Sequence, residues 1–219
     1  MDCCDPRGCD GIFGERFARH LARRYDKRGL DHTAARMTAF LRERGVEGRS
    51  VLEIGGGVGE IQIELLRLGA SRATNLELTS AYDDEASRLI EQTGMTGRVS
   101  RRIHDIAADA RQVEPADIVA LHRVVCCYPD YERLLTAAAE HARHLLVFSH
   151  PPRTVPSRVA FTVQNAIFRL IGKSFRAFTH PPEAMLAVLE DHGLQVSSRQ
   201  RARWWHVVGL ERRVPLAAD

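Results

Sequence analysis

The fold is decided by the stretch Ser50-Val51-Leu52-Glu53-Ile54-Gly55-Gly56-Gly57-Val58-Gly59. Its apolar run predicts a buried strand, its glycines predict a tight turn, and the pattern from Glu60 to Leu68 predicts a helix directly after the turn. Such a turn lets a ligand approach bare backbone and the positive end of a helix. The stretch therefore predicts a ligand site where the first strand passes into its helix.

The glycine spacing distinguishes two kinds of ligand. A dinucleotide site needs G-x-G-x-x-G, and here Glu60 occupies the third glycine position. The pattern that does fit is E-x-G-x-G-x-G, from Glu53 to Gly59. It resembles the first motif of class I S-adenosylmethionine-dependent methyltransferases. The resemblance implies that the glycine loop passes under the methionine and ribose of S-adenosylmethionine, and that Glu53 helps to hold the amino group.

The remaining chain alternates between strand and helix patterns. We expect a Rossmann-like α/β fold, with a seven-stranded, mostly parallel sheet and an antiparallel last strand. Residues 1–48 would form a leader and two helices, which the resemblance implies act as a lid over the cleft. Residues 49–211 would form the methyltransferase domain, with an insertion at 150–182 and a tail at 212–219. The insertion contains an apolar helix at about 155–171. This helix either packs against the rest of the fold or lines a pocket for a large apolar ligand.

Two acidic residues follow the next two strand patterns. Glu77 ends the second strand, 22 positions after Gly55, where a carboxylate can accept hydrogen bonds from both ribose hydroxyls. A solvated strand edge is the alternative for this residue. Asp105 follows the third strand, and the methyltransferase resemblance implies that it accepts from the adenine amino group while Ile106 packs on the ring. A capping role is the alternative for Asp105.

Motifs in the second half narrow the resemblance. They are Cys127-Tyr128-Pro129-Asp130, Leu145 to Pro151, Arg176 to His180, and Gly193. Their order and rough spacing are similar to those of magnesium-protoporphyrin O-methyltransferases, which also carry the insertion. That family has histidine where this chain has Cys127, and its histidine works with a tyrosine that Tyr25 matches. Because a thiol positions an oxygen poorly, this departure argues against the porphyrin itself as acceptor.

The loop after the fourth strand should face the transferred methyl group. His122 lies in this loop and is a candidate proton acceptor for a hydroxyl or thiol nucleophile. Cys126 and Cys127 lie in it too, and the leader cysteines Cys3, Cys4 and Cys9 are placed to fold over the same cleft. Converging cysteines would suit a soft metal, a metalloid or a thiol substrate. The alternatives are an apolar packing role and a disordered leader, and no zinc-ligand spacing is present.

Composition excludes several classes of protein. The chain has 219 residues, 44% of them hydrophobic, which suits one α/β domain with a buried core. The net charge of +3, from 31 basic and 28 acidic residues, is too balanced for a nucleic-acid footprint. Neither a signal peptide nor an apolar run of membrane-spanning length is recognisable. We therefore expect a cytoplasmic protein with reduced cysteines.

These observations predict methyl transfer from S-adenosyl-L-methionine to a small molecule. O-methylation of a carboxylate or hydroxyl on a large apolar or tetrapyrrole-like compound is the leading interpretation. S- or metalloid-methylation at a cysteine-lined site, or a non-enzymatic cysteine site for metal or a partner, is the alternative. Nucleic acid and a membrane span are not expected, and no metal ligand is assigned. The predicted catalytic residues are His122, Tyr25, Cys127 and Tyr128, and the predicted cofactor-binding residues are Glu53, Gly55, Gly56, Gly57, Glu77, Leu78, Asp105, Ile106 and His122.

Overall fold

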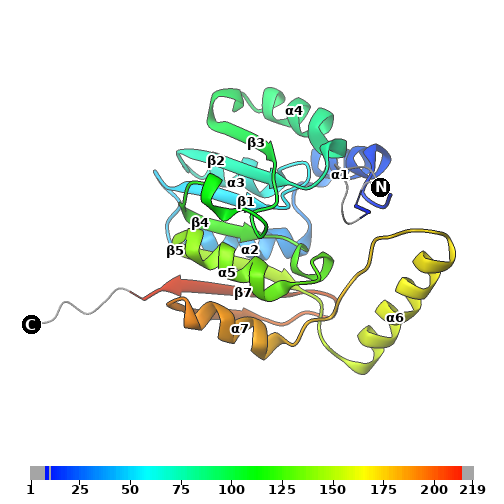
Figure 1. Cartoon of the computed structure of the whole chain (residues 1–219). Helices are drawn as coiled ribbons and strands as arrows, with labels where there is room; N and C mark the ends of the chain where they lie inside the picture. The colour runs from blue at the N-terminus through cyan, green and yellow to red at the C-terminus, as the bar shows by residue number, and fades with distance from the viewer. Residues whose placement is uncertain (1–7, 10, 214–219) are drawn as a thin grey trace, which may run out of the picture.

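The computed structural model describes residues 8–9 and 11–213, so Cys3, Cys4 and the end of the predicted tail lie outside the described residues. Seven strands form one sheet in the order β3-β2-β1-β4-β5-β7-β6 (Figure 1). The strands are β1 (Ser50–Ile54), β2 (Arg72–Glu77), β3 (Val99–Ile103), β4 (Ala116–Leu121), β5 (Ala142–His150), β6 (Leu194–Gln200) and β7 (His206–Arg212). The helices are α1 (Glu15–Arg28), α2 (His32–Glu43), α3 (Glu60–Arg67), α4 (Asp83–Gln92), α5 (Tyr131–His141), α6 (Val155–Leu170) and α7 (Pro182–Asp191).

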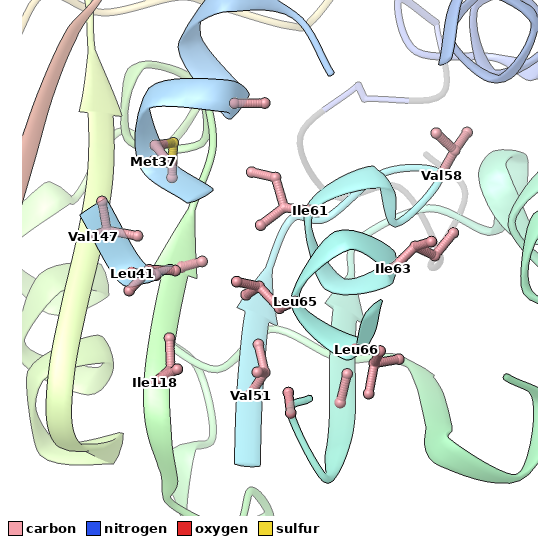
Figure 2. Packing of buried hydrophobic residues seen from close by; sticks show 14 of the residues in the cluster. Met37, Leu41, Val51, Val58, Ile61, Ile63, Leu65, Leu66, Ile118 and Val147 are labelled. Carbon is pink, nitrogen blue, oxygen red and sulfur yellow. The ribbon is translucent and has the colours of Figure 1, made fainter. Parts of the chain in front are cut away.

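The parallel strands bury both faces because their side chains alternate between two cores. Val51, Ile118 and Val147 face one core, which α1 to α4 cover. Figure 2 shows this core, where Met37 and Leu41 of α2 and the apolar side chains of α3 meet the strands. On the opposite face, alternate residues such as Leu52 and Val119 pack against α5 and α7. The result is a three-layer fold with helices on both faces of the sheet.

The last two strands join the sheet in antiparallel pairs, unlike the five strands before them. β7 runs antiparallel to both of its neighbours, β5 and β6. It therefore inserts between them and leaves β6, not the last strand, at the sheet edge. The Rossmann-like fold class is confirmed, including the antiparallel last strand.

The strand order positions the ligand site. β1 has β2 on one side and β4 on the other, and both pairs are parallel. The connections therefore run to opposite sides of β1, and a crevice opens beyond the carboxyl ends of β1 and β4. The glycine loop starts at this crevice.

Candidate active site

A cavity of about 200 Å³ opens at the carboxyl ends of β1, β2 and β4. Its floor is the glycine loop, and its walls include the strand-end residues Glu77, Asp105 and His122. Phe17 and Leu21, one helical turn apart on α1, also line the cavity. The structure thus brings most of the predicted site residues together on one cavity, under an apolar wall from the N-terminal segment.

Backbone geometry holds the glycine loop close to the sheet. Gly55 donates its N–H to the Leu76 carbonyl at 2.7 Å, and Gly57 donates to a carboxylate oxygen of Glu77. A Cβ on Gly56 would lie 2.4 Å from the Asn75 amide nitrogen and 2.7 Å from the Glu53 carboxyl carbon, so only glycine fits there. The loop is a cradle that bare backbone lines.

Glu53 is a predicted cofactor residue that lies outside the cavity. Its side chain is fully buried beneath the loop and accepts a hydrogen bond from the Gln62 N–H at 3.2 Å, and it does not line the cavity. Burial raises the pKa of Glu53 to about 8. Strand alternation turns this side chain toward the α3 backbone, so it supports the loop from below. The acidic residue that does reach the cavity beside the loop is Glu60, at the start of α3.

Glu77 and Asp105 both line the cavity, and each already accepts backbone hydrogen bonds. Glu77 accepts from the Gly57 and Leu78 N–H groups, and burial raises its pKa despite these bonds and the nearby Arg101. Asp105 accepts from the Ala107 N–H at 3.1 Å and from the Tyr128 hydroxyl at 3.1 Å. Asp105 therefore caps its own turn and also faces the cavity, so the two interpretations of this residue are compatible. Further apolar walls come from Leu78 and Ile106.

His122 lines the cavity at the carboxyl end of β4, and its side chain is only 12% exposed. Burial lowers the pKa of its imidazole to about 4, so the ring is neutral near pH 7. Its Nε2 is buried and has no hydrogen-bond partner among the described residues. The nearest acid is Asp31, whose Oδ1 lies 3.8 Å from that nitrogen. An unpartnered buried nitrogen in a cavity wall indicates a ligand contact, since such atoms are normally satisfied.

A charged cluster beside His122 was not anticipated by the sequence analysis. Arg24 of α1 contacts Glu60 at 2.9 Å and Asp31 at 3.2 Å, and Arg123 contacts Asp31 at 2.7 Å. All four side chains line the cavity, and the Nε atoms of both arginines are buried without a hydrogen-bond partner in the described structure. Arg123 has φ of +60°, an uncommon value outside glycine that often marks a functional site. The cluster therefore offers both cationic donors and carboxylate acceptors.

Tyr25 is a second predicted site residue that lies outside the cavity. Its hydroxyl donates to Glu64 at 2.6 Å and accepts from Arg67, both on the outer part of α3. Tyr25 does not line the cavity, although its neighbour Arg24 does. Adjacent residues of a helix point about 100° apart, so α1 can place only one of them over the loop. Sequence reasoning did not predict Arg24 as a site residue. The one sequence signal for it is its position next to Tyr25.

The structure places one of the two cysteines of the loop after β4 on the cavity. Cys127 lines the cavity, and so does Cys9, which packs in the same apolar cluster. Cys126 lies behind, with its sulfur 3.6 Å from that of Cys127. The hydrogen bond between the Cys126 and Cys127 sulfurs, together with burial, raises the pKa of Cys127 well above its usual value, so its thiol is protonated. Within the described ranges, no group of three or more His, Cys, Asp or Glu side chains could hold a metal ion.

The insertion contributes less to the site than expected. No residue of α6 lines the cavity. Phe161 and Phe168 pack against the cluster that contains Cys9, Phe175 and Ala177, and so support the cavity wall from outside. The other apolar side chains of α6 are exposed and do not line the cavity.

Sequence comparison finds no matching family model and no matching curated protein. Structural comparison finds methyltransferases. The magnesium protoporphyrin IX methyltransferase of Synechocystis with bound S-adenosylhomocysteine superposes with a TM-score of 0.72 at 18% identity, over 93% of this chain and 97% of that chain. An O-methyltransferase family 2 protein of Planctomyces limnophilus, in complex with apigenin, gives 0.64 at 20% identity, over 91% and 62%. A TehB-like methyltransferase of Corynebacterium glutamicum gives 0.64 at 13% identity, over 91% and 98%. The chain therefore has the fold of S-adenosylmethionine-dependent methyltransferases.

Proposed function

We propose that this chain transfers a methyl group from S-adenosylmethionine to an oxygen of an apolar small molecule. The observation that carries the proposal is the convergence of the glycine cradle, Glu77, Asp105 and the unpartnered His122 Nε2 on one cavity. The fold shared with methyltransferases, one of which has been solved both with S-adenosylhomocysteine and with S-adenosylmethionine bound, supports the same cofactor.

The residues present fit this cofactor. Glu77 has carboxylate oxygens for the ribose hydroxyls, and Asp105 has one for the adenine amino group, with Ile106 and Leu78 against the ring. The methionine end is a zwitterion and needs both signs of charge. Arg24 and Arg123 offer N–H donors to its carboxylate, and Glu60 and Asp31 offer acceptors to its ammonium group.

Bound S-adenosylmethionine supplies an activated methyl group on a positively charged sulfur. The new bond joins the acceptor oxygen to the methyl carbon, and the electrons of the broken bond stay on the sulfur. An acceptor hydroxyl also loses a proton, which the neutral His122 can take at Nε2. Asp31, 3.8 Å from that atom, then stabilises the imidazolium. A carboxylate acceptor has no proton to lose, and His122 would instead hold it as an N–H donor.

The apolar wall defines the acceptor that we propose. Phe13, Phe17 and Leu21 line the same cavity as the charged cluster, which favours a large apolar or tetrapyrrole-like compound with a single polar group. Cys127, protonated and turned toward the Arg123 carbonyl at 3.5 Å, lines the site as an apolar group. We propose a small molecule over nucleic acid, because the described strand-four loop lacks the proline-rich motif of amino-group methylases.

Calorimetric titration with S-adenosylhomocysteine tests the cofactor. We expect micromolar binding by the wild type and at least tenfold weaker binding by Glu77→Gln, with the exposed Glu132→Gln as the matched control. No binding at millimolar concentration would contradict the proposal.

Transfer of a labelled methyl group then tests the acceptor. The panel contains a flavonoid hydroxyl, a porphyrin propionate, an aromatic thiol and a transfer RNA. Label on the flavonoid or the propionate supports oxygen methylation. Label on the thiol alone, or on the transfer RNA alone, would contradict oxygen methylation and identify that compound as the class of acceptor.

A further inference from the structure

The outer face of α6 is apolar and open to solvent. Val155, Val159, Val163 and Ile167 follow one another at four-residue intervals, and each is at least 50% exposed. Leu170 and Ile171 extend this face at 86% and 60% exposed. No residue of α6 is buried, and Figure 1 shows the helix standing apart from the three layers. We call these six side chains the outer face.

The orientation of α6 is fixed from the inside. The Asn165 side chain bonds the backbone of Ala177 twice, accepting from its N–H at 2.9 Å and donating to its carbonyl at 2.8 Å. Phe161 and Phe168 pack against the Phe175 cluster on the same side. A rotation that buried the outer face would break these contacts, so the exposure of the face is built into the fold.

The segment around the outer face is positively charged. Residues 151–182 contain no Asp or Glu and carry five basic residues, Arg153, Arg158, Arg169, Lys173 and Arg176. The whole chain has a net charge of only +3, so the rest of the molecule is net negative. This asymmetry would turn α6 toward a negatively charged surface.

A second segment lies at the end of the sheet where β5 passes into the insertion. His150, the last residue of β5, pairs with His206, the first residue of β7. The start of the insertion therefore lies beside the end of the loop at 201–205. That loop carries Arg201, Arg203 and Trp204, which is 71% exposed. Arginine beside exposed tryptophan is typical of residues at a lipid–water interface.

We propose that the outer face of α6 docks on an anionic lipid surface. An amphipathic helix with an apolar face, basic flanks and no acidic residue is suited to lie in the interface plane of a bilayer. In the part of the chain that the structure describes, no helix has the length and apolar character of a membrane span. A second copy of the chain fits less well, because a twofold contact would bring the same basic residues of both copies together. The proposal does not depend on methyl transfer.

Vesicle sedimentation of the full chain tests the proposal. The vesicles contain phosphatidylcholine alone or an equal mixture with phosphatidylglycerol. We expect binding to the mixed vesicles that weakens with added salt, and little binding to phosphatidylcholine alone. Val163→Asp should weaken binding at least tenfold, because it puts a charge in the middle of the outer face. Thr162→Asp adds the same charge on the neighbouring polar flank, and should weaken binding by less than about threefold.

Several results would overturn the proposal. One is the absence of sedimentation with mixed vesicles, and another is equal loss in the two aspartate variants, which would indicate attraction by net charge alone. Light scattering provides a third, if the wild type is a dimer that Val163→Asp converts to a monomer, since the outer face then binds a second copy. Thermal unfolding and binding of S-adenosylhomocysteine should be the same in both variants, which excludes misfolding as the cause.

Discussion

The helix after the glycine loop and the helix of the insertion use the same apolar residue types in opposite ways. In α3, Ile61, Ile63 and Leu65 are fully buried against the sheet and the N-terminal helices. In α6, Val163 and Ile167 are 52% and 50% exposed. An apolar helical pattern therefore predicts the helix but not what covers its apolar side chains. Around the loop, burial stabilises the fold and shapes the cavity, whereas on α6 the apolar surface is left for a partner.

The largest expected difference between the two helices is in stability. Ile61→Ala removes a fully buried side chain and should lower the free energy of unfolding by about 2–5 kcal/mol. Ile167→Ala makes the same chemical change on the outer face and should stay within about 0.5 kcal/mol. Urea unfolding of both variants measures the contrast. Equal losses would show that α6 is packed in solution.

The two regions should also differ in their response to pH. The folded pKa of His122 is about 4, below the usual 6.5, so the unfolded chain binds more protons between these values. The stability contribution of His122 is present above about pH 6.5 and is lost as the pH falls toward 4, by about 3 kcal/mol in all.

This prediction is measured as the wild-type unfolding free energy minus that of His122→Asn, at several pH values. The difference should shrink as the pH falls, while vesicle binding through α6, whose only ionisable residues are arginines, should stay constant above pH 5. A difference that does not change with pH would contradict the buried, neutral state of His122.

Tight packing of the glycine loop predicts a smaller effect. Gly56→Ala places a methyl group 2.4 Å from the Asn75 side chain, and should cost about 1–3 kcal/mol and weaken S-adenosylhomocysteine binding. Gly97→Ala is the matched control, since nothing lies within 4 Å of its Cβ and neither glycine has a positive φ. Unfolding curves and calorimetry compare the two. Equal behaviour would mean that the loop is looser than described.

The charged cluster predicts the smallest of these effects. Arg24→Gln removes the charge that pairs with Glu60 and Asp31, and should weaken S-adenosylhomocysteine binding about tenfold if Arg24 contacts the methionine end. Arg158→Gln removes the same charge from α6 and should leave that affinity unchanged while weakening vesicle binding. If Arg158→Gln weakened S-adenosylhomocysteine binding and Arg24→Gln did not, the proposed roles of the charged cluster and α6 would be contradicted.

Local patterns predict much of this molecule because they depend on neighbouring residues. The alternation of strands and helices follows from side-chain periodicity, and Glu77, Asp105 and His122 can be placed at strand ends whose common edge follows from parallel pairing. Side-chain direction depends on packing between elements. Glu53 and Glu60 flank the same loop, yet only Glu60 faces the cavity, and Arg24 faces it in place of Tyr25.

By itself, the sequence determined the Rossmann-like fold and the strand-end residues of the cavity, because glycine spacing and hydrophobic period act over a few residues. The tertiary structure alone decided three further points. It assembled the cluster of Arg24, Asp31, Glu60 and Arg123 from separate elements, it placed Cys9 beside Cys127, and it turned the apolar side of α6 to solvent. Each depends on which surfaces meet when distant segments pack together, and that information is not local to any stretch of the chain.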